Sequence, residues 1–372
     1  MAAKLKALLN AQENKHDITR NLPSLTFESA LDEEEQRILY LRQQSHAHTT
    51  LVSASCSFLV SILNEVRQIR ADLAKTSQQR RAIQLLTADT LPKNPLKIGL
   101  IGCGRLGSHL VHALLSFGEV NPADIQISTR RPETLNTLKE KGVSVIYNNI
   151  EVASKVHLLF VCVLPSQLNK VLEEICQNLD KQTLVYCLVN HTTSHRLKRL
   201  LQSVNIFIPS FVFDNSTSNA WNSCMSVEEA LKDEQMVRKC CPLSNEGKGS
   251  CVHLTEKWVE LVICAFINQC SDLQLTSRDA LDLLHGICMG LDKLEKGTAN
   301  RFVERDFIIN WDDDDTEPRR FPKFDLSKIH ENDSHVIKKL RTSQILQEGF
   351  TKKFLSVFRS HDDVHEQTDE RN

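Results

Sequence analysis

The stretch Leu96-Lys97-Ile98-Gly99-Leu100-Ile101-Gly102-Cys103-Gly104-Arg105-Leu106-Gly107-Ser108-His109-Leu110-Val111 decides the fold of this chain. An apolar strand leads into glycines spaced Gly-x-Gly-x-x-Gly, and an apolar helix follows, which is the context that a dinucleotide fingerprint requires. Gly102 permits the tight turn, Gly104 lets the backbone approach a pyrophosphate, and Gly107 lets the helix pack closely on the strand. The helix N-terminus offers free N–H groups to phosphates. The alternative is a strand-to-helix turn with fortuitous glycines.

The turn itself predicts the phosphate-binding residues of such a site. They are Gly102, Cys103, Gly104, Arg105, Leu106 and Gly107. Arg105 adds positive charge near the phosphates in this interpretation, whereas an exposed arginine at a helix start is the plain alternative.

The residues after the turn indicate which dinucleotide binds. Residues 125–132 are predicted to form the second strand and the turn that follows it. Sites for NAD usually place a carboxylate there, about 20 residues beyond the glycines, to hold the ribose 2′-OH. Here Ser128 and Thr129 are followed by Arg130 and Arg131. Hydroxyls and guanidinium groups suit a 2′-phosphate, so we expect NADP(H) rather than NAD(H), the alternative being a solvated basic turn.

From Leu96 onward the chain alternates between apolar strands and helices. This alternation predicts an α/β fold with a doubly wound parallel Rossmann sheet, because crossovers between parallel strands are right-handed. Strands are expected at 96–101, 124–129, 143–147, 156–163, 183–188 and 205–209, and helices from Ser108, Glu133 and Gln167. The run from His157 to Val163 is continuously apolar, which is typical of a strand buried on both faces.

The flanking regions predict helices on either side of this domain. Acidic residues 32–35 mark a helix start, and Leu51, Phe58, Ile62, Val66 and Ile69 recur on one helical face. Further apolar stripes begin at Trp258 and, after a cap at Thr276 or Ser277, at Leu281. The predicted organisation is a helical extension (1–94), an NADP-binding Rossmann domain (95–212), a mainly helical C-terminal domain (213–350) and a charged tail (351–372).

The composition favours a globular intracellular protein. The chain has 372 residues, 41% of them hydrophobic, and a net charge of −2, with basic residues interspersed among acids. We therefore expect no nucleic-acid or membrane partner, and no apolar run approaches a membrane span. The 12 cysteines lack a Cys-x-x-Cys pair, so no metal site is expected. A cytoplasmic location is expected, while Glu13 and Asp17 make a mitochondrial presequence a weaker alternative.

Three motifs together resemble the pyrroline-5-carboxylate reductase superfamily. They are Ile98-Gly99-Leu100-Ile101-Gly102-Cys103-Gly104, Ser128-Thr129-Arg130-Arg131 and Val161-Cys162-Val163-Leu164-Pro165-Ser166-Gln167. Such enzymes reduce a cyclic imine to proline with NAD(P)H and carry an all-helical dimerisation domain. The resemblance implies a possible homodimer through the C-terminal helices. It covers residues 96–212 and fades to a faint likeness at 275–280.

Several positions depart from that family's pattern. The family has lysine where this chain has Leu164, Ala-Gly where it has Val189-Asn190-His191, and Met-Pro-Asn where it has Ile208-Pro209-Ser210. The Ser-Pro-Gly-Gly-x-Thr segment that binds the substrate carboxylate in the family has no counterpart. The fold and the cofactor therefore transfer to this chain, whereas the substrate does not.

Two functions follow from these patterns. The first is an NADP(H)-dependent oxidoreductase that reduces a small imine or carbonyl substrate. The ligand crevice of the fold would then place Val163, Leu164, Pro165 and Asn190 near the nicotinamide. His191 is a candidate proton donor, but the favoured alternative is that it caps the helix start at Thr192-Thr193-Ser194 or faces solvent, so the catalytic residues are unknown. The alternative function is a catalytically degenerate NADP(H)-binding regulatory or scaffold protein.

Overall fold

The computed structural model describes residues 32–73, 94–189, 192–214, 221, 225–291, 301–308 and 319–359. The chain forms two compact units, Met1–Ser45 and His46–Asn372. Helix α2 (Glu33–Leu73) begins in the first unit and continues into the second. It begins within the acidic run that the sequence marks as a helix start, because negative side chains are favourable near the positive end of a helix dipole.

A six-stranded sheet lies at the centre of the second unit. Its strands are β1 (Ile98–Ile101), β2 (Ile125–Ser128), β3 (Ser144–Ile146), β4 (Leu158–Val161), β5 (Leu184–Cys187) and β6 (Ile206–Phe207). They lie in the order β3-β2-β1-β4-β5-β6, and every neighbouring pair is parallel. This confirms the doubly wound Rossmann fold. The chain leaves β1 in one direction and returns at β4 to continue in the other, so the topological switch point lies between these strands.

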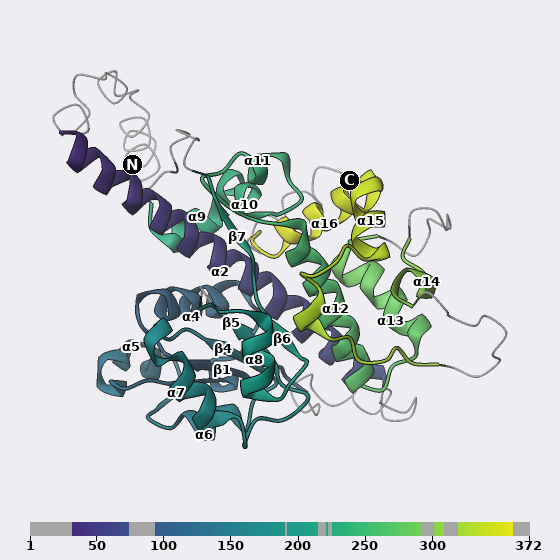
Figure 1. Ribbon diagram of the computed structural model, residues 1–372, viewed down its shortest axis with the longest axis horizontal. Coiled ribbons are helices and arrows are strands. Elements are labelled where there is room, and N and C mark those ends of the chain that lie inside the picture. Colours follow the sequence, from purple (N-terminus) through teal and green to yellow (C-terminus); the bar gives the residue numbers. More distant parts are fainter. Residues whose placement is uncertain are drawn as a thin grey trace, which may run out of the picture. The chain divides into compact units, whose positions relative to one another are not determined.

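Helices connect these strands on both sides of the sheet (Figure 1). They are α4 (Arg105–Phe117), α5 (Asn136–Glu140), α6 (Asn149–Ala153), α7 (Pro165–Ile175) and α8 (Ser194–Leu201), with 3₁₀ turns η3 (Pro122–Asp124) and η4 (Pro132–Leu135). Three predicted helix starts were wrong. Helix α4 starts at Arg105 because Gly104 is its N-cap, and α7 starts at Pro165 because proline suits the first helical turn. Glu133 lies in η4, and α5 starts only at Asn136.

Side chains alternate between two buried clusters across the sheet. Leu100, Phe160 and Tyr186 belong to the cluster that includes α4 and α5 residues. Leu159 and Val161 belong to the cluster formed with α6, α7 and α8. Both faces of the sheet are therefore covered, which explains why its strands are continuously apolar.

The α2 residues of the second unit pack into the same core as the sheet. The Phe58 ring lies 5.0 Å from that of Phe354 and 6.3 Å from that of Trp258. Trp258 lies in α12 (Glu256–Asp272), and its indole N–H donates to the Tyr186 hydroxyl of β5 at 3.1 Å. The sheet, α2 and the C-terminal helices thus share one buried cluster. The domain boundaries proposed from the sequence stay predictions.

The C-terminal region is mainly helical, as expected. Its elements are β7 (Phe211–Phe213) antiparallel to β8 (Val252–Leu254), α9 (Val227–Lys232), α10 (Glu234–Cys240), α11 (Asn245–Lys248), α12, α13 (Ser277–Leu283), a π-helical turn (Leu284–Cys288), α14 (Glu304–Phe307), η7 (Leu326–Lys328), α15 (His335–Thr342) and α16 (Gln344–Ser356). Thr276 caps α13 by accepting from Asp279 N–H at 3.2 Å, which confirms the predicted helix start. Helix α12 is buried on nearly all sides rather than along one stripe.

Helix α2 also contradicts the expectation that no segment approaches a membrane span. Residues Tyr40–Arg70 are long and apolar enough to cross a membrane by length and composition. However, 89% of its most apolar part is buried inside the protein. The small polar residues between its leucines and valines, such as Ser53, Ser55 and Ser57, are fully buried as well. The apolarity of this helix therefore matches its place in the core.

Candidate functional site

The glycine turn joins the carboxyl ends of three neighbouring strands. Gly102 has a φ of +89°, and a Cβ on it would lie 2.8 Å from the carbonyl oxygen of Cys162, just beyond β4. Its N–H donates to the carbonyl oxygen of Ser128, at the end of β2, at 2.9 Å. Both the backbone conformation and the lack of space require glycine here. The turn is thereby held at the switch point of the sheet.

The next two glycines shape the start of α4. A Cβ on Gly107 would lie 2.7 Å from the Gly102 carbonyl oxygen, so this glycine lets the helix approach the turn. Gly104 is different, because nothing lies within 4 Å of a Cβ built on it. It is the N-cap of α4, and no side chain caps the helix or places an acid in its first turn. The first N–H groups of this 13-residue helix are left for an anionic ligand.

The other side chains of the turn place no negative charge beside the start of α4. Burial raises the pKa of the Cys103 thiol to about 12, so it is neutral at physiological pH. Leu106 packs against the core, whereas Arg105 is exposed. Arg105 is therefore the residue of the turn that adds a formal charge.

The end of β2 carries hydroxyls with different surroundings. Ser128 is buried, and its hydroxyl donates to the Asn149 amide oxygen of α6 at 2.7 Å. Asn149 in turn donates to the Glu174 carboxylate of α7 at 3.0 Å. Thr129 is half-buried, and its Oγ1 accepts from Arg131 N–H at 3.4 Å. The Ser128 hydroxyl is thus engaged in holding α6, and the Thr129 hydroxyl proton is the one left for a ligand.

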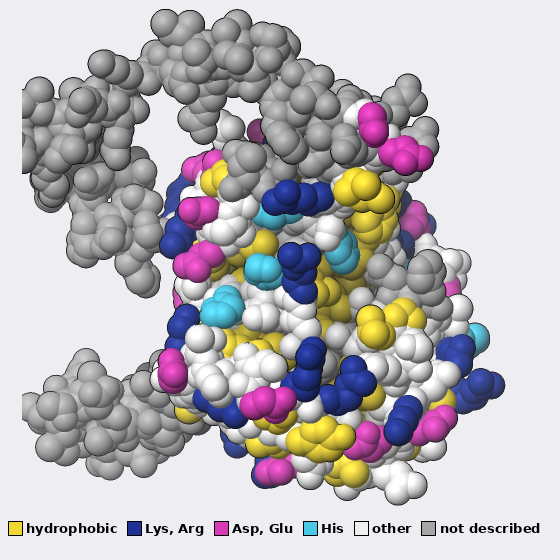
Figure 2. Space-filling view, turned by 90° about the vertical axis from the view of Figure 1, so that its left-hand side faces the viewer, with side chains coloured by type: hydrophobic (Ala, Val, Ile, Leu, Met, Phe, Trp, Pro, Cys, Tyr) yellow, Lys and Arg dark blue, Asp and Glu magenta, His cyan; other side chains and the backbone are white. Residues whose placement is uncertain are grey.

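The two arginines after β2 also differ in whether their side chains have a hydrogen-bond partner. The Gln167 side-chain amide is assigned the orientation that satisfies its hydrogen bonds. Its oxygen then accepts from both terminal nitrogens of Arg130, at 3.1 and 3.2 Å. Gln167 lies in the first turn of α7, so this contact crosses from the end of β2 to the residues that follow β4. Arg131 is exposed, and its guanidinium group has no partner among the described residues. Figure 2 shows the side of the molecule where α4 and α5 lie, with basic side chains near its centre and acidic ones mainly around its rim.

The ends of β4 and β5 line the other half of the crevice. Val163 is half-buried beside Gly102, Leu164 is 62% exposed as the N-cap of α7, and Pro165 is its exposed first residue. The proposed residues Asn190 and His191 lie outside the described part of the chain. Thr193 caps α8 by accepting from Arg196 N–H at 3.3 Å.

One polar side chain at this end of the sheet was missed by the sequence analysis. His330 lies 122 positions after Ile208, yet its Nε2 is 2.8 Å from the Ile208 carbonyl oxygen beyond β6. Its Nδ1 lies 3.5 Å from the hydroxyl of Ser210. No motif surrounds His330 in the sequence, so only the packing of the C-terminal region reveals this contact.

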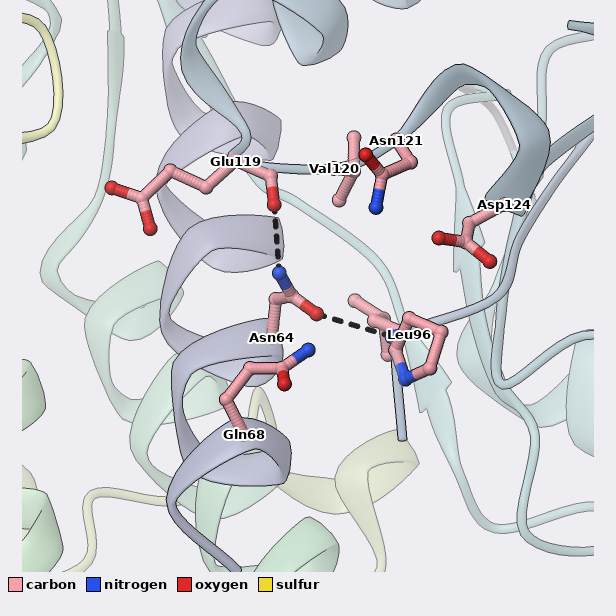
Figure 3. Close-up of a pocket in the computed structure, with 8 residues that line it drawn as sticks. Asn64, Gln68, Leu96, Glu119, Val120, Asn121 and Asp124 are labelled. Atoms are coloured by element: carbon pink, nitrogen blue, oxygen red, sulfur yellow. Dashed lines mark hydrogen bonds between the residues drawn. The ribbon is translucent and has the colours of Figure 1, made fainter. Parts of the chain in front are cut away.

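Three cavities lined by described residues lie elsewhere. One of about 240 Å³ lies at the amino ends of β1 and β2, between α2 and the residues that enter these strands (Figure 3). Others of about 250 and 630 Å³ are lined by C-terminal residues. Within the described part of the chain, no three His, Cys, Asp or Glu side chains are grouped to hold a metal ion.

Known proteins match the Rossmann region, and some match most of the chain. The family described as NADP oxidoreductase coenzyme F420-dependent matches residues 97–190. Pyrroline-5-carboxylate reductase 3 of Danio rerio is 34% identical over 31% of this chain and 40% of its own length. The solved pyrroline-5-carboxylate reductase of Coxiella burnetii aligns with 71% of this chain and 96% of its own, at 18% identity and a TM-score of 0.29.

The similarity to one mouse protein extends well beyond the Rossmann region. The NADP-dependent oxidoreductase domain-containing protein 1 of Mus musculus is 31% identical over 92% of this chain and 93% of its own length. The match therefore includes residues both before and after the Rossmann region in the sequence. The chain belongs to the family of NADP-dependent oxidoreductase domain-containing protein 1.

Proposed function

We propose that this chain binds NADP(H) across the carboxyl ends of its sheet. The observation that carries the proposal is the uncapped start of α4, with open space at Gly104, at the switch point of a Rossmann sheet. This is the place and the geometry that suit a pyrophosphate. The residues of the glycine turn, from Gly102 to Gly107, would hold it. The name of the mouse relative and the matched family description point to the same cofactor.

The end of β2 supports NADP(H) over NAD(H). No carboxylate stands at the end of this strand, where it would hold a ribose 2′-OH and repel a 2′-phosphate. Arg131 has a free guanidinium group there, and Arg130 is held beside it by a neutral amide oxygen. We assign Thr129, Arg130 and Arg131 to the 2′-phosphate, and Ser128 to positioning this turn.

The β4–β6 half of the crevice would take the nicotinamide end. Val163, Leu164 and Pro165 offer an apolar surface there. We assign Asn190 to the same end of the cofactor from its position after β5 in the sequence. A buried Thr192 hydroxyl without a partner in the described structure adds a polar group just before α8. The cofactor supplies hydride transfer when bound, so the protein's task is to orient it and the substrate and to manage the proton. We therefore propose the reduction of a small imine or carbonyl compound.

The cofactor assignment predicts that arginine substitutions discriminate between two dinucleotides. Replacing Arg130 and Arg131 by alanine should weaken NADPH binding by about 10- to 100-fold and change NADH binding little, because charge-assisted bonds to the 2′-phosphate are lost. Calorimetric titration with both dinucleotides measures the difference. The double variant K181A/R199A removes the same charge from exposed positions before β5 and late in α8, and should bind like the parent. An equal loss for NADPH and NADH would contradict the assignment.

The reaction itself is tested by NADPH oxidation. The purified chain is mixed with NADPH and a panel of cyclic imines, ketones and aldehydes, and the fall in absorbance at the NADPH band is followed. Oxidation that depends on one of these compounds supports the oxidoreductase. Tight NADPH binding without oxidation by any of them would instead support a regulatory NADP(H)-binding protein.

A further inference from the structure

A segment from the C-terminal region runs along the outer edge of β6 (Figure 1). At its start, Leu326 N–H donates to the Val204 carbonyl oxygen at 3.1 Å, and Asp325 forms an ion pair with Lys198 of α8. At its end, His330 bonds to Ile208 beyond the strand. The segment covers an edge that would otherwise expose unpaired backbone groups. It also brings an imidazole to the carboxyl end of the sheet.

The partners of this imidazole define its tautomer. A carbonyl oxygen only accepts, so Nε2 of His330 carries a proton and donates it to Ile208. In the neutral ring, Nδ1 is then an acceptor and faces the Ser210 hydroxyl, which can donate to it. Ser210 and His330 are both half-buried, so each retains access to solvent or ligand. The Ser210 hydroxyl is therefore paired with an imidazole whose other nitrogen is held by a carbonyl oxygen. In this geometry a proton can pass between the hydroxyl and the imidazole.

Ser210 and His330 lie on the β4–β6 half of the sheet, away from the two arginines that follow β2. A dinucleotide binds across this fold with one nucleotide on each half of the sheet. The basic turn after β2 assigns the β1–β3 half to the adenosine 2′-phosphate. The nicotinamide nucleotide then belongs to the β4–β6 half, where Ser210 follows the end of β6.

We propose that Ser210 is the proton donor to the substrate and that His330 is its relay. The inference rests on the proposed function and deepens it. As the substrate carbon gains a hydride, the electron pair of its double bond moves to oxygen or nitrogen, and this atom takes the Ser210 hydroxyl proton. Ser210 takes a proton from Nδ1 of the His330 imidazolium, which becomes the neutral tautomer of this structure. Solvent then returns one proton to His330, and the reverse sequence serves oxidation.

The chemistry of both groups suits this task. An imidazole ring can both donate and accept a proton at its nitrogens, so it can lose and regain a proton during turnover. The Ile208 carbonyl oxygen accepts the Nε2 proton in either charge state, and it stabilises the cation when His330 is protonated. The competing explanation is that His330 only fastens its segment to β6.

The first test is spectroscopic and needs no turnover. In protein labelled with ¹⁵N-histidine, the H330Q variant assigns the His330 resonances. We expect the Nε2–H tautomer, a shift of its nitrogen resonances in S210A, and a further shift on adding NADP⁺ that saturates with the calorimetric Kd. The exposed His335 of the same region is the internal control and should not respond. If the ¹⁵N chemical shifts of His330 do not change when NADP⁺ binds, the proton relay is wrong, while cofactor binding still stands.

The second test separates relay from fastening during turnover. Glutamine at position 330 keeps a donor for Ile208 but cannot relay a proton, so H330Q should fold normally and lower kcat by about 10²-fold. S210A should do the same, S210T should restore part of the rate, and imidazole in the buffer should restore part of the H330A rate. KM and the NADPH Kd should stay within about threefold, and H335A should match the parent.

Each other outcome decides against one proposal. If H330Q and S210A retain full kcat, or if imidazole restores nothing while melting temperature falls, His330 only fastens its segment and the relay is wrong. If NADPH binds and no compound in the panel is reduced, the relay is wrong as well, while cofactor binding stands. If NADPH does not bind to the parent chain at all, the proposed function is wrong, and the relay that rests on it is wrong too.

Discussion

Gly102 and Gly104 stand two positions apart, yet the reason for a glycine differs between them. At Gly102 the protein itself leaves no alternative, because φ is positive and the Cys162 carbonyl oxygen is close. At Gly104 the protein leaves ample space and φ is −85°. The need for glycine there comes from the ligand that would approach the backbone. The sequence motif predicts these two roles, and the tertiary structure adds the physical reason for each of them.

This difference gives a prediction for the pair of alanine variants. Gly102→Ala should lower the free energy of unfolding by about 1–3 kcal/mol, because alanine is strained at this φ and its Cβ would meet the Cys162 carbonyl oxygen. Gly104→Ala should unfold like the parent within about 0.5 kcal/mol, yet bind NADPH at least about tenfold more weakly. Urea denaturation and calorimetry measure the two effects. Loss of stability in the Gly104 variant, or unchanged binding, would speak against the pyrophosphate site.

The arginine pair shows what residue types alone leave open. Two guanidinium groups after β2 were predictable from the sequence, and so was their preference for phosphate. The contact of Arg130 with Gln167 was not, because it depends on how far α7 lies from the end of β2 across the sheet. The buried hydrogen bond from Ser128 to Asn149 likewise depends on where α6 begins.

At the scale of elements, helix α2 joins the amino ends of the strands to the core. The Asn64 side chain donates to the Glu119 carbonyl oxygen at 2.8 Å and accepts from Leu96 N–H at 3.1 Å (Figure 3). Glu119 follows α4 and has a positive φ of 52°, while Leu96 enters β1. A single amide thus fixes two chain segments to α2.

We predict that Asn64→Ala destabilises the protein by about 1–3 kcal/mol, because two backbone groups lose a buried partner. The matched control is Gln68→Ala, one turn further along α2 on the same cavity, which should cost less than about 0.5 kcal/mol because Gln68 makes no hydrogen bond in the described structure. Chemical denaturation of both variants gives the comparison. Similar values for the two would show that Asn64 does not hold these segments.

The helical regularity of α2 was visible in the sequence, but its surroundings were not. An apolar stripe predicts one buried face, whereas from Thr50 to Asn64 this helix is buried on all sides. The sheet packs on one side of it, and aromatic side chains of α16 pack on another, with Phe58 and Phe350 at 5.1 Å. The hydrophobic periodicity of the sequence predicts the helix. It does not show which distant parts of the chain pack against the helix.

For the whole molecule, two histidines couple stability to pH. Burial, and then Arg67 and Lys97, lower the pKa of His157 to about 4. Burial, and then Arg301, lower the pKa of His285 to about 4 as well. In the unfolded chain both titrate near pH 6.5. Between pH 6.5 and 4 the unfolded state therefore takes up protons that the folded state does not, so stability is full above pH 6.5 and falls as pH decreases toward 4.

The expected loss is about 2–3 kcal/mol for the buried His285 between pH 7.5 and 4.5. Urea denaturation at several pH values measures it. His285→Gln should flatten part of this dependence, since glutamine still offers an acceptor to Phe302 N–H, which His285 binds at 2.9 Å. The exposed His195→Gln serves as the control and should follow the parent curve. An unchanged slope in the His285 variant would contradict this account.

The sequence by itself determined the local features of this protein: the glycine turn, the parallel sheet around it, the basic end of β2 and the cap of α13. These depend on neighbouring residues, whose conformational preferences and spacing are written directly in the chain. Only the tertiary structure decided that α2 enters the common core, that Arg130 bonds to Gln167, and that His330 reaches the Ser210 hydroxyl. Such contacts join residues far apart in sequence, and they form because separate elements bury their apolar faces against one sheet.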